Sequence, residues 1–244
     1  MKPELTKGPL SGIRIIDFTW KAVGPWSSRM LTPYGAEVIP AENVVEGFEL
    51  VKKIEADEGR AFVHPFEGPW TSRGTGTLGL EFSDQAGKLD AVVVPIGGGG
   101  LASGVSTAIK LAQPHCAVYG VEPEGSSAVK QAVDAGAIVP VTPKSVADGL
   151  GAPYAGSWTL PLAASLLDGI VTLPDEEILG GLHFAMQRTK QVVEPAGAAA
   201  LAALLFRRVP VSTGDRVVVI LSGGNVDLAR IPEFLERATP IPGA

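Results

Sequence analysis

The chain has 244 residues, of which 45% are hydrophobic and 19% charged, and 26 Asp and Glu outnumber 20 Lys and Arg to give a net charge of −6. This length suits one large domain or two small ones, and the ordinary apolar share excludes a wholly disordered chain. The absence of a basic stripe argues against a nucleic-acid or anionic-membrane partner, and no run approaches the ~18 apolar residues of a membrane helix. The N-terminus lacks the apolar core of a secretion signal and Cys116 is the only cysteine, so we expect a cytoplasmic protein without an internal disulfide.

Short Val- and Ile-rich runs alternate with glycine turns and Ala-rich segments along the chain. This rhythm is typical of an α/β protein with a mostly parallel sheet and helices on both faces. In chain order, the sequence predicts strand 13–18, helix 26–31, strand 37–39, helix 44–58 with Gly59 as its C-cap, strand 62–63, strand 89–95, helix 101–112, strand 117–122, helix 126–135, helices 175–193 and 195–208, and strand 216–221.

The strongest local signal is a run of four glycines, Gly97 to Gly100, between a buried strand and a helix. Without side chains, successive backbone N–H groups can converge on an anion, and the helix N-terminus adds a partial positive charge. We interpret this loop as a phosphate site, with tight strand–helix packing as the alternative. A Walker A loop is excluded because Leu101 and Ala102 follow Gly100, where that motif requires Lys and then Ser or Thr.

A dinucleotide site is a second interpretation of the same loop. Gly97, Gly99 and Ala102 satisfy the G-x-G-x-x-A pattern, and Glu122 lies about 20 residues downstream, where the ribose-binding acid of that fold belongs. The second glycine-rich strand end, residues 222–225, argues against this interpretation, because a nicotinamide-binding fold does not require it.

Eight segments between residues 34 and 227 follow one another as in a known enzyme group: YGAEV, FVHPFEGP, GTGTLGLE, LDAVVVPIGGGGL, VYGVEPEGS, VADGL, VVEPAGAAALAAL and VILSGGNVDL. Together they resemble the threonine/serine dehydratases of the fold-type II pyridoxal-phosphate (PLP) enzymes, with serine racemase as a relative. The resemblance implies an α/β fold like the larger lobe of those enzymes, PLP as the cofactor and a small amino-acid substrate. It also implies β-elimination of water from L-threonine or L-serine to give a 2-oxo acid and ammonia. The resemblance leaves open whether the chain forms a homo-oligomer.

The resemblance also implies roles for individual residues. A neutral Ser222 would hydrogen-bond the pyridine nitrogen, and Glu194 would lie near the cofactor. Glu122 matches a divalent-cation ligand of racemase-like members, but Ala128 replaces their second carboxylate and Ser126 offers only its backbone carbonyl, so the cation site is incomplete. The residues that would cradle the PLP phosphate are Gly97, Gly98, Gly99, Gly100 and Leu101.

The N-terminal region departs from this enzyme group. The S-x-K-x-R-G segment with the catalytic lysine and the S-x-G-N-H segment with a ring-contacting Asn are both absent. Residues 9–39 instead resemble the start of family III CoA transferases, with a GIRIIDF strand and a GAEVI strand. We therefore expect a CoA-transferase-like βαβ fragment in residues 1–40. Residues 41–244 would form a dehydratase-like α/β domain with an incomplete smaller lobe.

The missing lysine has a chemical consequence. Lys21 is the only lysine near the end of the first predicted strand, and it is a candidate for the missing amine, with an ordinary surface lysine as the favoured alternative. We expect PLP to bind without a covalent link and turnover to be impaired. The alternatives are a non-catalytic remnant that binds phosphate ligands, a nicotinamide-dependent oxidoreductase and a CoA transferase.

Overall fold

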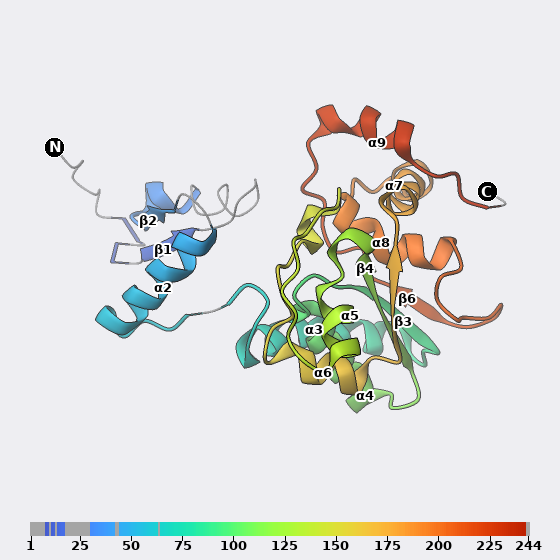
Figure 1. Ribbon diagram of the computed structural model, residues 1–244, viewed down its shortest axis with the longest axis horizontal. Helices are drawn as coiled ribbons and strands as arrows, with labels where there is room; N and C mark the ends of the chain where they lie inside the picture. Colours follow the sequence, from blue (N-terminus) through green and yellow to red (C-terminus); the bar gives the residue numbers. More distant parts are fainter. Residues whose placement is uncertain are drawn as a thin grey trace. The chain divides into compact units, whose positions relative to one another are not determined.

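The structure is a computed structural model that describes residues 8–9, 11–12, 14–17, 30–41, 44–62 and 64–242 (Figure 1). The chain divides into two compact units, residues 1–62 and 63–244. The predicted boundary at residue 40 separates a CoA-transferase-like part from a dehydratase-like part, and it stays a prediction. Among the described residues, no helix has both the length and the apolar character needed to cross a bilayer.

The first unit contains a parallel pair of strands, β1 (Arg14–Asp17) and β2 (Glu37–Pro40). The short 3-10 helix η1 (Thr32–Tyr34) precedes β2 along the chain. Helix α2 (Val44–Glu58) follows and ends at Gly59, whose φ of 66° is the left-handed conformation of a C-cap glycine. Both predicted strands and the predicted helix 44–58 are confirmed. Most of the predicted helix 26–31 lies outside the described residues.

The second unit is built on a four-stranded parallel sheet. The central strand β3 is completely buried, with Val92 and Val94 packed on one face and Val93 on the other. This is the expected behaviour of an apolar strand that helices cover on both sides, and the predicted α/β class is confirmed. The order of the strands is β5 (Gly169–Leu173), β4 (Ala117–Pro123), β3 (Ala91–Pro95) and β6 (Val217–Val219).

Helices cover both faces of this sheet (Figure 1). The Val92 face packs against α3 (Pro69–Ala86), α4 (Gly100–Ala112), α5 (Ala128–Ala135) and α6 (Thr159–Leu166). The Val93 face packs against α7 (Asp175–Phe184) and α8 (Pro195–Leu205), and α9 (Ile231–Arg237) packs on α7. Short helical turns are η2 (Glu124–Ser126), η3 (Asp148–Leu150), η4 (Ala185–Thr189) and η5 (Leu228–Arg230).

Helix α3 is the largest element that the sequence patterns do not predict. Its interior contains Gly74, Gly76 and Gly79, and glycine disfavours a helix when only local propensity counts. In the folded chain Gly76 and Gly79 face α4 and let the two helices approach closely. A Cβ at Gly79 would lie 2.8 Å from the Ala108 Cβ, and one at Gly104 would lie 2.1 Å from Thr75 Oγ1. Tertiary packing therefore overrides the local preference. Elements α6, β5 and α9 are likewise unpredicted.

Two predicted elements differ from the structure. The predicted helix 175–193 ends early, because α7 gives way to the π-helical turn η4 and Lys190 then adopts a left-handed φ of 60°. Glu194 is extended, as expected for a residue that precedes proline. In the predicted strand 62–63, Phe62 lies outside any strand and residue 63 is not described.

Candidate functional site

The two glycine-rich loops lie at the same edge of the sheet. Strands β3 and β6 are parallel neighbours, with Val93 opposite Val219, so the segments that follow them leave the sheet at its carboxyl edge. In open α/β sheets this edge is where ligands bind. The structure thus brings residues 97–100 and residues 222–225 to one side of the sheet.

The four-glycine loop is closely packed by the rest of the protein. A side chain at Gly98, Gly99 or Gly100 would collide with a neighbouring segment, and one at Gly97 would be a tight fit, so the loop serves close packing whether or not it also binds an anion. An added Cβ at Gly97 would lie 3.3 Å from Leu150 Cα, and one at Gly98 would lie 2.1 Å from the Phe66 ring. At Gly99 the added Cβ would lie 2.9 Å from the Thr159 side chain, and at Gly100 it would lie 2.9 Å from the Phe66 backbone.

The carbonyl groups and the N–H groups of the same loop differ in their hydrogen bonding. The Gly98 carbonyl accepts a hydrogen bond from Thr159 Oγ1 at 2.7 Å, and the Gly99 carbonyl accepts one from the Ser103 N–H at 2.8 Å. Within the part of the chain that the structure describes, the N–H groups of Gly97, Gly98 and Gly99 have no hydrogen-bond acceptor. The loop therefore carries free donors at the N-terminus of α4, where the helix dipole adds positive potential. An anion such as a phosphate group fits these donors.

Glu194 organises the second loop. Its Oε2 accepts the Asn225 N–H at 3.1 Å, and its own N–H donates to the Gly223 carbonyl at 3.0 Å. Its Oε1 also lies 3.1 Å from the position that a Cβ at Gly149 would take. Burial raises the pKa of the Glu194 carboxyl group, and the Asn225 N–H opposes this shift. Ser222, at the start of the loop, is exposed, so its hydroxyl group is accessible to a ligand.

Glu122 has a structural role at the end of β4. It is completely buried, and its two carboxylate oxygens accept the N–H groups of Val129 and Lys130, each at 2.8 Å. The carboxylate thus caps the N-terminus of α5. Burial raises its pKa to about 7, and the two backbone N–H donors oppose the shift. A ribose cannot reach this carboxylate, so the dinucleotide interpretation loses its supporting acid.

The predicted cation ligands do not form a cluster with other acidic groups. The Ser126 hydroxyl donates to the Leu150 carbonyl at 3.0 Å, which ties it to the 145–151 loop. No group of three or more His, Cys, Asp or Glu side chains in the described ranges could hold a metal ion. Lys21, the candidate amine, lies outside the described residues.

Sequence reasoning missed three residues that shape the four-glycine loop: Phe66, Leu150 and Thr159. Phe66 packs edge-to-face with Tyr154 at a ring separation of 5.7 Å, which fixes its ring over Gly98. The FVHPFEGP and VADGL segments contain two of these residues, but no local pattern indicates that they meet the glycines. Thr159 begins an unpredicted helix and carries no sequence signal.

Comparison with known proteins adds to this geometry. A family model with the description "Pyridoxal-phosphate dependent enzyme" matches residues 9–223. The chain belongs to this family of PLP-dependent enzymes. This membership confirms that the recognised family is one of PLP-dependent enzymes. The likeness of residues 9–39 to CoA transferases is not tested by the match and stays a prediction.

Relatives of this chain include several amino-acid lyases. Phenylserine dehydratase from Ralstonia pickettii is 44% identical over 88% of this chain and 66% of its own length. L-threonine ammonia-lyase from Geobacter sulfurreducens is 40% identical over 84% of this chain and 51% of its own length. Among solved structures, maize serine racemase is 30% identical with a TM-score of 0.76, covering 92% of this chain and 69% of that one. The chain thus spans between half and two thirds of the curated relatives just named.

Proposed function

We propose that the chain binds PLP without a covalent link at the carboxyl edge of its sheet. The observation that supports this best is the set of free N–H groups at Gly97, Gly98 and Gly99 on the strand end next to Ser222. A phosphate group fits the first strand end and a pyridine nitrogen fits the hydroxyl group of the second. The proposed reaction is β-elimination of water from a small hydroxy amino acid, which gives a 2-oxo acid and ammonia.

The residues of the chain would divide the work as follows. The N–H groups of the glycine loop and the N-terminus of α4 would hold the phosphate. The hydroxyl group of Ser222 would donate to the ring nitrogen. Glu194 would keep Ser222 in place through its contacts with Gly223 and Asn225. When bound, PLP supplies an electron-withdrawing ring that eases loss of the α-proton and then of the β-hydroxyl group.

Ser222 favours elimination over reactions that need stronger electron withdrawal. A neutral hydroxyl group leaves the ring nitrogen largely unprotonated. Elimination tolerates this because the departing hydroxyl group takes the electron pair with it. The choice of a serine at this position therefore supports a dehydratase-type reaction.

We propose further that turnover is low. The family's lysine-bearing segment does not occur in the given sequence, so we expect the amine that usually takes the α-proton to be missing from its place. General-base catalysis contributes about 10²–10⁴-fold to a rate, and a loss of that order is expected. Lys21 is the one residue that we propose as a substitute.

A titration with PLP, followed by fluorescence and absorbance, tests the proposal. We expect saturable binding that inorganic phosphate weakens, and no lysine modified after borohydride reduction. Production of 2-oxo acid from L-threonine, L-serine and phenylserine is then measured for the natural chain and for Lys21→Ala. Absence of saturable binding, or preference for NADH, contradicts the proposal. Robust turnover abolished by Lys21→Ala would show that Lys21 is catalytic and that impairment was the wrong expectation.

A further inference from the structure

The loop of residues 145–151 lies between the four-glycine loop and Glu194. Leu150 Cα is 3.3 Å from the position of a Cβ at Gly97, and Gly149 lies against the carboxylate of Glu194. The second half of the loop is held by the hydrogen bond from Ser126 Oγ to the Leu150 carbonyl, at 3.0 Å. A shift of this loop therefore changes the contacts of both parts of the candidate site.

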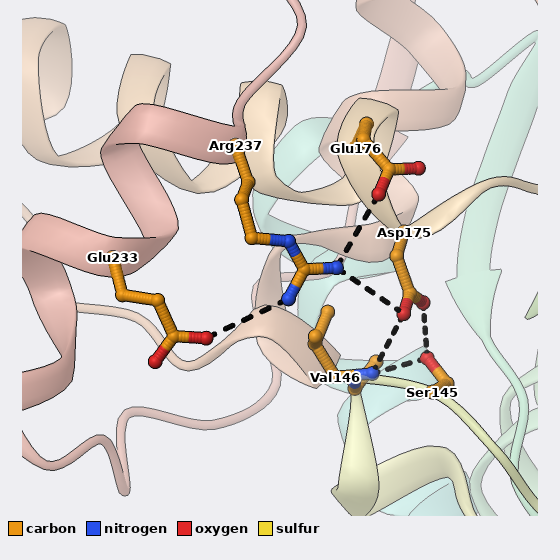
Figure 2. Close-up of polar contacts among 7 residues, drawn as sticks. Ser145, Val146, Asp175, Glu176, Glu233 and Arg237 are labelled. Carbon is orange, nitrogen blue, oxygen red and sulfur yellow. Dashed lines mark hydrogen bonds and ion pairs between the residues drawn. The ribbon is translucent and has the colours of Figure 1, made fainter.

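One carboxylate holds the first half of this loop. Asp175, the first residue of α7, accepts the Ser145 hydroxyl at 2.5 Å with one oxygen and the Val146 N–H at 3.0 Å with the other (Figure 2). Ser145 Oγ in turn accepts the Ala147 N–H at 3.0 Å. Both oxygens of Asp175 are thus used to order residues 145–147.

Helix α9 supports Asp175 from the other side. Arg237 Nη2 lies 4.0 Å from Asp175 Oδ2 and 3.3 Å from Glu176 Oε1, and its Nη1 lies 3.6 Å from Glu233 Oε1 (Figure 2). The helix itself is anchored by Phe234, which is 1% exposed and packs with Leu179 of α7. Because α9 packs on α7 in this way, the guanidinium group of Arg237 lies at the start of α7.

We propose that Asp175 is a positioning residue of the candidate site. It holds residues 145–151 against Gly97 and Glu194, and Arg237 keeps its carboxylate in place. The link to cofactor affinity rests on the proposed function. Binding sites lose affinity when the shell that supports their contact residues loosens, even though the supporting residue does not touch the ligand.

Asp175→Asn tests the inference, with Asp168→Asn as a matched control. Asp168 also accepts a backbone N–H, from Val118 at 2.7 Å, and a side-chain donor, Lys110 Nζ at 2.7 Å, but it lies at the opposite, amino edge of the sheet. We expect Asp175→Asn to weaken PLP binding about tenfold, equivalent to about 1.4 kcal/mol. It should also speed amide hydrogen exchange at Ala147 and Leu150 in the ligand-free protein. The control should lower stability and leave both readouts unchanged.

Two further pairs of variants refine the test. Ser145→Ala should weaken PLP binding and speed exchange, but less than Asp175→Asn does. Ser145→Thr keeps the hydroxyl group, so its PLP binding and exchange should match those of the natural chain. Arg237→Gln should weaken PLP binding about threefold, by loosening Asp175. Glu233→Gln removes a contact of Arg237 that does not touch Asp175, and it should change nothing. If Asp175→Asn does not fold, the Ser145 pair carries the same comparison.

The outcomes separate the inference from the proposed function. If the natural chain does not bind PLP, the proposed function fails, and exchange in the ligand-free variants still decides whether Asp175 orders the loop. Unchanged exchange at Ala147 and Leu150 overturns the inference. Faster exchange with an unchanged dissociation constant for PLP overturns the link between this loop and the site.

Discussion

The two glycine-rich strand ends have similar compositions but differ in exposure and in hydrogen bonding. Residues 98–100 are buried, and Phe66 and Thr159 occupy the space that side chains would need. Ser222 and Asn225 are exposed, and the loop that contains them depends on Glu194. Steric fit holds the first loop. The glycines of the second loop are closely packed as well, since a Cβ at Gly223 would collide with the Glu194 side chain, but this loop is also held by one hydrogen bond to the Glu194 carboxylate and one from the Glu194 backbone N–H.

This difference changes how glycine substitutions should be interpreted. A substitution in the first loop alters the packing of the protein before any ligand is present, so loss of ligand binding alone does not locate the site. In the second loop Gly223 and Gly224 are close-packed too, but Ser222 itself is exposed, so a change of Ser222 reports on the ligand more directly. Measurements of stability and affinity on the same variants separate the two effects.

Gly98→Val should give the largest effect. The added side chain would enter the Phe66 ring, and overpacking of this kind costs about 3 kcal/mol. Urea unfolding should show the lower free energy of unfolding in the absence of PLP. Phe66→Ala combined with Gly98→Val should recover part of the loss, because the double variant removes the colliding ring.

Gly74→Ala provides the matched control for that experiment. A Cβ at this position in α3 would meet no atom within 4 Å. The substitution should therefore stabilise the protein by about 0.5–1 kcal/mol, through the better helix propensity of alanine. If Gly98→Val were as harmless as Gly74→Ala, steric fit would not be what holds the first loop.

The end of β4 sharpens the comparison, because Glu122 combines complete burial with hydrogen bonds to N–H groups. Its pKa is raised from the ordinary 4.5 to about 7, so the folded protein binds this proton more tightly than the unfolded chain. The contribution to stability is full below pH 4.5 and is lost as the pH rises to about 7. The total loss is on the order of 3 kcal/mol.

Urea unfolding from pH 5 to pH 8 measures this effect. The free energy of unfolding should fall with pH across this window in the natural chain, and the fall should be smaller in Glu122→Gln. Parallel pH profiles for the two proteins would show that Glu122 does not titrate in this range.

Glu194→Ala tests the electrostatic support of the second loop. Loss of the acceptor for the Asn225 N–H should cost about 1 kcal/mol and speed amide exchange at Asn225. Glu194→Gln retains an acceptor oxygen, so its effect on exchange should be smaller. Equal exchange rates in all three proteins would mean that the loop is ordered by something other than this side chain.

Ser222→Ala should have the smallest effect on stability, within about 0.5 kcal/mol, because the side chain is exposed. Its effect on PLP should be larger than its effect on folding. Loss of one hydrogen bond corresponds to about 1 kcal/mol, or about a fivefold larger dissociation constant for PLP. Unchanged affinity and absorbance would remove Ser222 from the proposed site.

The sequence determined the elements whose signals are local. Strand β3, helix α4 and helix α2 with its Gly59 cap lie at or within two residues of their predicted bounds, because apolar runs and glycine stops depend only on neighbours along the chain. The family was also recognisable from the order of its segments, and the match of the family model over residues 9–223 agrees with that recognition. The positions of the two glycine-rich strand ends followed from the same local patterns.

Only the tertiary structure decided which residues surround those strand ends. Phe66, Leu150 and Thr159 come from segments far apart in the chain, and they meet the glycines because parallel strands and crossing helices bring them to one edge. The same holds for α3, where Gly76 and Gly79 disfavour a helix locally but allow close contact with α4 in the folded chain. Glu122 is equally indistinguishable in the sequence from a ligand-binding acid, because its use as a cap of α5 depends on where the N–H groups of Val129 and Lys130 lie in space.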